Sequence, residues 1–166
     1  MKRTLLSFLA LAAMSATAMA ADIKPAIIYD LGGKFDKSFN EAAFNGAEKF
    51  KTETGIDYRD FEISNDSQRE QALSRFAKDG NNPIGRAGFS WGAALEKIAA
   101  QYPDTNFAII DSVVDLPNVR SIVFKEHEGS FLVGMLAAMA SKSGKIGFVG
   151  GMDIPLIRRF ACGLSL

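Results

Sequence analysis

A glycine loop that leads into an amphipathic helix constrains this chain more than any other feature. Gly32 and Gly33 follow directly on the short apolar run Ala26–Tyr29 and a two-residue turn. Apolar residues between Ala43 and Phe50 then recur at helical spacing, which predicts one buried helix face. The segment is therefore expected to form a strand, a loop and a helix. In an open α/β sheet such a loop lies at the carboxyl end of its strand, where ligands bind.

The residues at the predicted helix start allow two interpretations. Ser38 and Glu41 have the spacing of a capping box, in which the hydroxyl accepts a backbone N–H and the carboxylate reaches back to the N-cap. Phe39 and Asn40 come next, and an aromatic ring beside an amide can stack on a flat ligand and bind its edge. The simpler alternative is a packing role for Phe39 and a solvated Asn40, and the spacing alone favours it.

The first twenty residues have the pattern of a cleavable export signal. A positive start, Lys2-Arg3, precedes the apolar run Leu5–Met14, and Ala18-Met19-Ala20 forms a small-residue cleavage site. The apolar run is too short for a good membrane span. No cysteine follows the cleavage site, and Cys162 is the only cysteine, so we expect neither a lipid anchor nor an internal disulfide. The expected mature protein begins at Ala21, is mildly acidic and is periplasmic.

Beyond the signal, strand and helix patterns alternate, and no internal repeat interrupts them. This alternation predicts an α/β fold with a doubly wound parallel sheet and helices on both faces. We expect strands over 26–29, 56–63, 84–89, 106–110, 119–124 and 145–149. We expect helices over 39–52, 67–78, 90–101 and about 129–141, and a last short helix from Pro155.

The expected third strand contains a conflict. Central parallel strands are normally near-continuous apolar runs, whereas this one reads Ile84-Gly85-Arg86-Ala87-Gly88. Its glycines weaken the strand, and Arg86 would need either a partner or an edge position. The next strand ends in Asp111, whose carboxylate would point into the same crevice as the Phe39 loop. A turn-forming role for Asp111 is an equally good interpretation.

The residue types that catalysis and metal binding require are scarce. His127 is the only histidine, which leaves no zinc site, and Glu126-His127-Glu128 is more simply a solvated turn than a ligand cluster. Neither a nucleophile elbow nor a P-loop occurs. Basic and acidic residues both number 19, so no basic excess indicates nucleic acid. We expect no enzyme and no cofactor. An exported α/β chain with a ligand crevice is typical of a solute receptor.

Three sequence blocks resemble the basic membrane protein family of ABC-transporter solute-binding proteins. They are Asp36-Lys37-Ser38-Phe39-Asn40, residues 125–134 and residues 144–152. The resemblance extends over the mature chain as far as Gly163. It implies a periplasmic-binding-protein type I fold, whose two lobes close on a ligand by a hinge. The N-terminal ligand-binding lobe would span 21–124, and the start of an incomplete second lobe would span 125–166.

The family's best-understood members are purine nucleoside receptors, and this implies roles for individual residues. Phe39 would stack on the purine base, which contributes roughly 1–3 kcal/mol per base. Asn40 and Asp111 would hydrogen-bond to the edge of the base. The resemblance thereby reverses the preference for a packing role of Phe39 and a solvated Asn40.

Other candidates follow from the same resemblance. Asp36 would hold the loop or approach the sugar, and Met152 and Asp153 would approach the ligand from the second lobe. The expected partner is an ABC permease in the inner membrane, and the receptor is expected to be a monomer. A sugar receptor, or a ligand-sensing subunit for a membrane kinase, is the alternative function.

The departure from the family pattern is also informative. Family members are longer, and Leu164-Ser165-Leu166 does not follow their pattern. The chain looks truncated, so we expect weak or no nucleoside binding, because one wall of the crevice would be missing. Apolar residues from Phe131 to Met139 are expected in the core of a complete fold. In an incomplete one they would be exposed and prone to aggregation.

Overall fold

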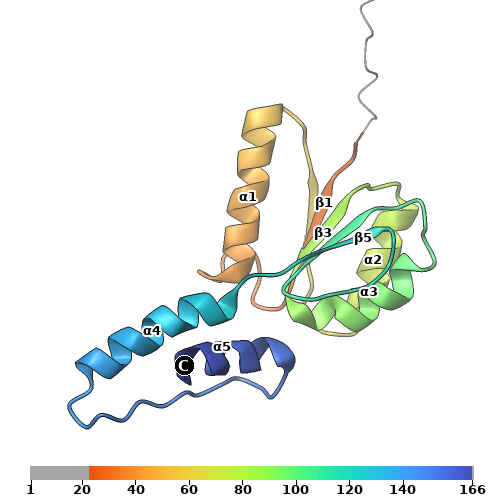
Figure 1. Cartoon of the computed structure of the whole chain (residues 1–166). Coiled ribbons are helices and arrows are strands. Elements are labelled where there is room, and N and C mark those ends of the chain that lie inside the picture. The colour runs from red at the N-terminus through yellow and green to blue at the C-terminus, as the bar shows by residue number, and fades with distance from the viewer. Residues whose placement is uncertain (1–22, 166) are drawn as a thin grey trace, which may run out of the picture.

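The computed structural model describes residues 23–165, so the predicted export signal lies outside the described part (Figure 1). Five parallel strands form one sheet in the order β2-β1-β3-β4-β5. The strands are β1 (Ala26–Tyr29), β2 (Arg59–Glu62), β3 (Ile84–Ala87), β4 (Phe107–Ile110) and β5 (Val119–Ile122). The helices are α1 (Phe39–Thr54), α2 (Gln68–Lys78), the short 3-10 helix η1 (Phe89–Trp91), α3 (Gly92–Ala99), α4 (Glu126–Ala140) and α5 (Pro155–Ser165).

Helices cover both faces of the sheet, with α1 on one side and α2 and α3 on the other (Figure 1). Successive strand residues point to opposite faces. Ile27 and Ala108 therefore face α1, where they line an apolar groove of about 320 Å³. Ile28 and Ile109 face α2 and α3 and are fully buried in the main core. This arrangement confirms the predicted doubly wound parallel α/β fold.

The helix α1 begins where the sequence predicts, but its cap differs. The Ser38 hydroxyl makes no capping bond. Instead, the Asp36 carboxylate accepts the N–H groups of Ser38, Asn40 and Glu41 at 2.8, 3.1 and 3.1 Å. The backbone turns through a left-handed residue, Lys37 (φ 54), so that Asp36 lies over the first helical turn. The predicted capping box is therefore wrong, because a charged acceptor two residues upstream takes the free N–H groups.

The conflict in the third strand persists in the structure. Strand β3 is the central strand of the sheet, so Arg86 does not lie at an edge. Its side chain is buried, with 1% of the residue exposed. None of its three guanidinium nitrogens has a hydrogen-bond partner. The guanidinium carbon lies 5.7 Å from the Phe107 ring centroid. Burial lowers the pKa of Arg86 to about 9.

The predicted strand over 145–149 is wrong for this chain. These residues are irregular, and Val149 is 97% exposed. A strand needs a neighbour to satisfy its backbone, and within residues 23–165 no neighbouring strand lies beside this segment.

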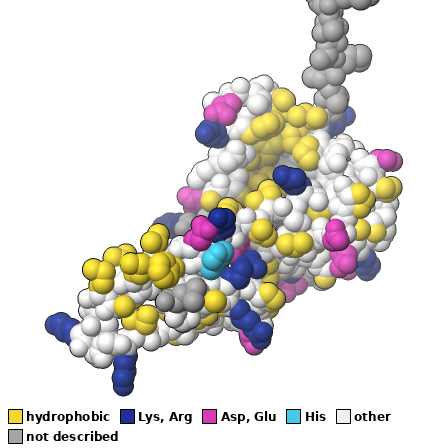
Figure 2. Space-filling model, in the orientation of Figure 1, with side chains coloured by type: hydrophobic (Ala, Val, Ile, Leu, Met, Phe, Trp, Pro, Cys, Tyr) yellow, Lys and Arg dark blue, Asp and Glu magenta, His cyan; other side chains and the backbone are white. Residues whose placement is uncertain are grey.

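The same region leaves α4 open on one side. Helix α4 packs on α5, yet Leu136 and Met139 are largely exposed, not in a core. Figure 2 shows the hydrophobic side chains gathered over α4. None of the helices in the described range is long and apolar enough to span a bilayer.

Candidate ligand site at the carboxyl edge of the sheet

A cavity of about 560 Å³ lies where the carboxyl ends of the strands meet helices α4 and α5. Phe39, at the start of α1, lines it from the β1–α1 loop. Asp111, directly after β4, lines it from the neighbouring part of the sheet edge. The structure thus brings two predicted site residues to one cavity. The other lining residues are Phe124, Lys125, Glu126, Gly129, Ser130, Val133, Phe148, Phe160 and Leu164.

The cavity is rich in aromatic side chains. Phe39 is 38% exposed, so its ring is accessible to a ligand. Phe124, Phe148 and Phe160 line the same space and are also exposed. Sequence reasoning missed these three, because only the tertiary fold brings residues from the segments around α4 and α5 to the cavity that Phe39 lines. Flat aromatic ligands suit such a lining, since ring faces stack with one another.

Asp111 adds a polar group to this aromatic cavity. Its left-handed backbone (φ 67) follows β4, and its N–H donates to the Ile122 carbonyl at 2.9 Å. Loss of solvent raises the pKa of the Asp111 carboxyl, and the nearby charge of Glu126 raises it further. Arg159 acts in the opposite direction. Asp111 is therefore a hydrogen-bond acceptor held in a partly desolvated position.

An ion pair between a buried carboxylate and a partly exposed arginine lies beside Asp111. Glu126, the first residue of α4, is 8% exposed and accepts two hydrogen bonds from the Arg159 guanidinium at 2.7 and 3.3 Å. The hydrogen bond from Arg159 lowers the pKa of Glu126. The pair ties the start of α4 to α5 and places a charge close to the candidate ligand. Sequence reasoning missed it, because 33 residues separate the partners.

Asn40 is not among the lining residues and is only 3% exposed. Its amide oxygen accepts the Asp30 N–H at 3.1 Å. Its amide nitrogen donates to the carbonyls of Asp30 and Leu31 at 3.1 and 3.4 Å. In this structure Asn40 therefore fixes the β1–α1 loop from behind Phe39.

Asp36 also serves the loop. Desolvation raises the pKa of its carboxyl, but the N–H groups of Glu41, Asn40 and Ser38 together outweigh that effect and leave the pKa lowered. A carboxylate held this way stays ionised and orders the helix start.

Met152 and Asp153 lie apart from Phe39 and Asp111. They line a separate cavity of about 280 Å³, which shares only Phe148 with the larger one. The Asp153 carboxylate is occupied by the Arg158 guanidinium, at 2.5 and 2.8 Å. Of the predicted site residues, the structure thus unites Phe39 and Asp111.

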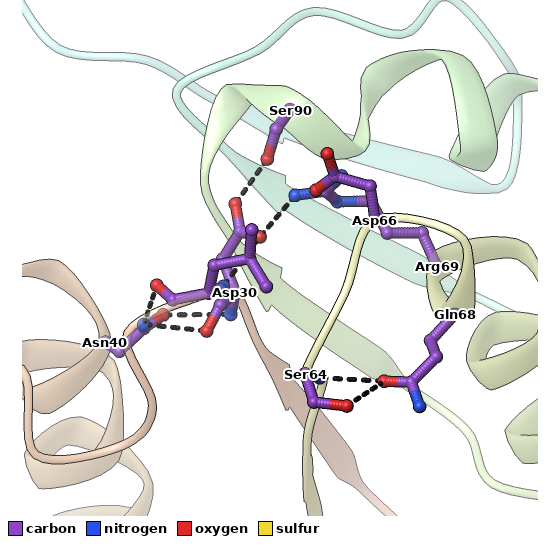
Figure 3. A network of polar contacts seen from close by, with 8 residues as sticks. Asp30, Asn40, Ser64, Asp66, Gln68, Arg69 and Ser90 are labelled. Carbon is purple, nitrogen blue, oxygen red and sulfur yellow. Dashed lines mark hydrogen bonds and ion pairs between the residues drawn. The ribbon is translucent and has the colours of Figure 1, made fainter.

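A polar network supports the loop that carries Phe39 (Figure 3). Asp30, directly after β1, accepts hydrogen bonds from the Leu31 N–H at 2.8 Å, from Arg69 of α2 at 2.6 Å and from the Ser90 hydroxyl of η1. Arg69 also pairs with Asp66.

Within residues 23–165, no group of three histidine, cysteine, aspartate or glutamate residues could hold a metal ion.

Comparison with known proteins shows which family has this architecture. The family model for PnrA-like ABC transporter substrate-binding proteins matches residues 24–165. The chain belongs to this family. The match covers the loop with Phe39, the sheet edge with Asp111 and both helices of the cavity wall.

Relatives within the PnrA-like family are much longer than this chain. A CD4+ T-cell-stimulating antigen of Listeria monocytogenes is 35% identical over 150 residues, which cover 87% of this chain and 42% of the relative. The ABC transporter nucleoside-binding protein BmpA of Lactococcus lactis is 36% identical over 147 residues, with 86% and 42% covered. A lipoprotein of Pyrococcus horikoshii is 38% identical over 147 residues, with 85% and 36% covered. The chain therefore spans about two fifths of the length of these relatives.

Solved structures agree with the family assignment. An ABC transporter solute-binding protein of Aeropyrum pernix has a TM-score of 0.76 and 34% identity, and the match covers 86% of this chain and 41% of that one. A 5-methylthioribose-binding protein of Thermotoga lettingae has a TM-score of 0.69 at 16% identity, which shows the shared fold alone. The fold is thus that of periplasmic solute-binding proteins, and this chain covers 41% of the Aeropyrum pernix structure.

Proposed function

We propose that this chain is the N-terminal part of a periplasmic receptor that delivers purine nucleosides to an ABC permease. The observation that carries the proposal is the meeting of Phe39 and Asp111 at one aromatic cavity. The relative from Lactococcus lactis, which is named a nucleoside-binding protein, supports the ligand class. A lobe over 21–124, followed by the start of a second lobe, fits the position of the cavity between the sheet edge and α4.

The chemistry of the two residues suits a purine. Phe39 offers an exposed ring at the start of α1, on which a base can stack, for roughly 1–3 kcal/mol. Asp111 offers a carboxylate that accepts hydrogen bonds from ring N–H or exocyclic amine groups. A sugar site would need several carboxylates and amides around its hydroxyl groups. Asp111 and Glu126 are the only carboxylates among the described lining residues, and Glu126 is occupied by Arg159.

The remaining predicted site residues take supporting roles in this proposal. Asn40 and Asp36 hold the loop that presents Phe39, as their hydrogen bonds indicate. Met152 and Asp153 approach the ligand from the second lobe when the lobes close. Since the chain spans two fifths of its relatives, we propose that it binds nucleoside only weakly by itself, because closure over the base needs the rest of the second lobe.

Ligand-observed NMR tests the proposal, since it detects weak binding. Saturation-transfer signals are recorded for inosine, guanosine and adenosine, and for ribose and glucose as sugar controls. We expect signals from the purine protons that Phe39→Leu abolishes and that the matched variant Phe35→Leu leaves intact, because Phe35 is exposed away from the cavity lining. Signals from the sugars alone, or purine signals insensitive to Phe39→Leu, would refute the proposed ligand site.

A further inference from the structure

We propose that Arg69 is a positioning residue for the ligand site, which acts by fixing the loop that presents Phe39. The inference rests on the proposed function for its purpose, but its physical content concerns the loop itself. Arg69 lies on α2 and is not among the residues that line the cavity. Its effect would therefore reach the ligand only through other residues.

The first link joins Arg69 to the end of β1. One guanidinium nitrogen donates to the Asp30 carboxylate at 2.6 Å, and another donates to Asp66. The Arg69 side chain is 11% exposed, so water competes little for these bonds. Charge-assisted hydrogen bonds in such a setting are stronger than neutral ones. The guanidinium thus connects the start of α2 to the residue at which the loop begins.

The second link joins Asp30 to Phe39. Arg69, Ser90 and the Leu31 N–H hold the Asp30 carboxylate, while the Asn40 amide holds both the N–H and the carbonyl of Asp30 (Figure 3). Both the side chain and the backbone of Asp30 are therefore fixed. Because Asn40 directly follows Phe39 in α1, the chain of contacts sets the start of that helix.

A glycine near Asp30 supports the same conclusion independently. Gly88 adopts φ 103, and a Cβ atom there would lie 2.9 Å from an Asp30 carboxylate oxygen. Only glycine both allows this backbone conformation and leaves room for the carboxylate to approach η1. The chain between β3 and η1 is thus shaped around Asp30, as the network requires.

An arginine suits this position better than a lysine. Its planar fork spans two carboxylates at once, which a single ammonium group does less well. The guanidinium carbon also lies 5.4 Å from the ring centroid of Trp91, the only tryptophan of the chain. Trp91 fluorescence therefore gives a local signal for the loss of the Arg69 contact.

The test compares variants of the full 166-residue chain. Arg69→Met removes the guanidinium group, and Arg69→Lys keeps the positive charge. Ser90→Ala removes only the hydrogen bond from the Ser90 hydroxyl to Asp30, and it serves as a second variant should Arg69→Met fold poorly. Arg75→Met is the matched control, because Arg75 lies on the same helix and its side chain is 61% exposed. Amide hydrogen exchange of residues 30–41 is measured against that of the core strands, together with Trp91 fluorescence and nucleoside binding by NMR.

We expect Arg69→Met to speed exchange of the loop amides by about tenfold relative to the core strands, and to weaken nucleoside binding by a similar factor. Arg69→Lys should recover part of both effects, Ser90→Ala should act in the same direction, and Arg75→Met should change neither. Trp91 fluorescence should shift in both Arg69 variants only.

Two results would overturn the inference. One is loop exchange that stays unchanged, or that rises only in step with the core strands, as a purely structural role of Arg69 predicts. The other is a loosened loop in Arg69→Met with nucleoside binding as strong as in the unmodified chain. If the unmodified chain binds no nucleoside, the proposed function fails, and loop exchange alone still decides whether Arg69 positions Phe39.

Discussion

At the scale of a single residue, the proposed role of Asp111 predicts that ligand binding depends on pH. Desolvation and the Glu126 charge raise the pKa of its carboxyl, so it takes up a proton at a higher pH than an ordinary aspartate. Protonation turns one carboxyl oxygen into an O–H donor and removes the negative charge that attracts N–H donors. We therefore expect nucleoside binding to weaken as the pH falls through this raised pKa, and Asp111→Asn to remove that dependence.

Ligand-observed NMR between pH 4 and pH 7 measures this effect. Asp115→Asn is the control, since Asp115 is exposed and lies outside the cavity lining. Identical pH profiles for the unmodified chain and Asp111→Asn would show that the Asp111 carboxylate does not contact the ligand.

Arg86 is the least favourable residue of the core. A charge buried without a partner costs several kcal/mol, and replacing buried charges by apolar residues often stabilises proteins by about 1–4 kcal/mol. We expect Arg86→Met to raise the free energy of unfolding by about this amount, measured by urea denaturation. Arg75→Met should change it by less than about 0.5 kcal/mol. A destabilised Arg86→Met protein would mean that Arg86 has a partner in solution.

The same residue has a signature in alkaline solution. The pKa of Arg86 is lowered to about 9 in the folded state, while the unfolded chain keeps the higher, ordinary value of an arginine. Between these values the unfolded state binds more protons, so stability rises with pH. The advantage of Arg86→Met should therefore be full at pH 7 and smaller at pH 10. A constant difference between the two proteins would contradict the lowered pKa.

At the scale of elements, α4 and α5 cross through two glycines. A Cβ atom at Gly163 would lie 2.2 Å from the His127 carbonyl oxygen, and one at Gly134 would lie 2.5 Å from the Leu164 carbonyl oxygen. Both contacts are with backbone, so the helices would have to separate. Because Glu126 and Arg159 sit on the same helix pair, separation would also disturb the cavity wall.

Gly163→Ala should therefore lower the free energy of unfolding of the helix pair by about 1–3 kcal/mol. Thermal melting followed by far-ultraviolet circular dichroism measures this loss. Gly129→Ala is the control, since Gly129 lies in α4 with open space around it and alanine favours helix by about 1 kcal/mol. Equal melting curves for the two variants would show that the crossing is not tight.

The elements differ in how far sequence patterns predict them. The strand β1 and the helix α1 follow from apolar periodicity and from glycines at the loop and at Gly55, which ends α1 with φ 71. The capping box failed because the cap depends on a backbone reversal at Lys37, which no spacing rule contains. The prediction of a strand over 145–149 failed because an apolar strand pattern shows only that a segment can pair, and pairing needs a neighbouring strand.

At the scale of the whole molecule, the site was predictable in part. Phe39 and Asp111 meet because carboxyl ends of parallel strands share one edge, a consequence of topology that the sequence pattern already implies. Phe124, Phe148 and Phe160 come from segments placed by the α4–α5 pair, which depends on the Glu126–Arg159 contact over 33 residues. Such long-range contacts leave no local signal.

The open side of α4 predicts how the chain behaves in solution. Leu132, Leu136 and Met139 are exposed at 62%, 67% and 81% and form an apolar surface (Figure 2). Surfaces of this kind promote association. We expect concentration-dependent scattering of light that the double variant Leu136→Glu and Met139→Glu reduces. Val113→Glu, at an exposed apolar position outside α4, should leave it unchanged. Scattering that none of these changes affects would place the association elsewhere.

The most direct measurement is a residue-resolved NMR titration of the labelled chain with a purine nucleoside. The proposed function predicts weak, saturable shifts of the amides around Phe39 and Asp111, and no such shifts with ribose or glucose. No shift with any nucleoside, or shifts with sugars alone, would contradict the proposed ligand. Binding at micromolar strength or tighter would contradict the claim that this chain alone cannot close over the base.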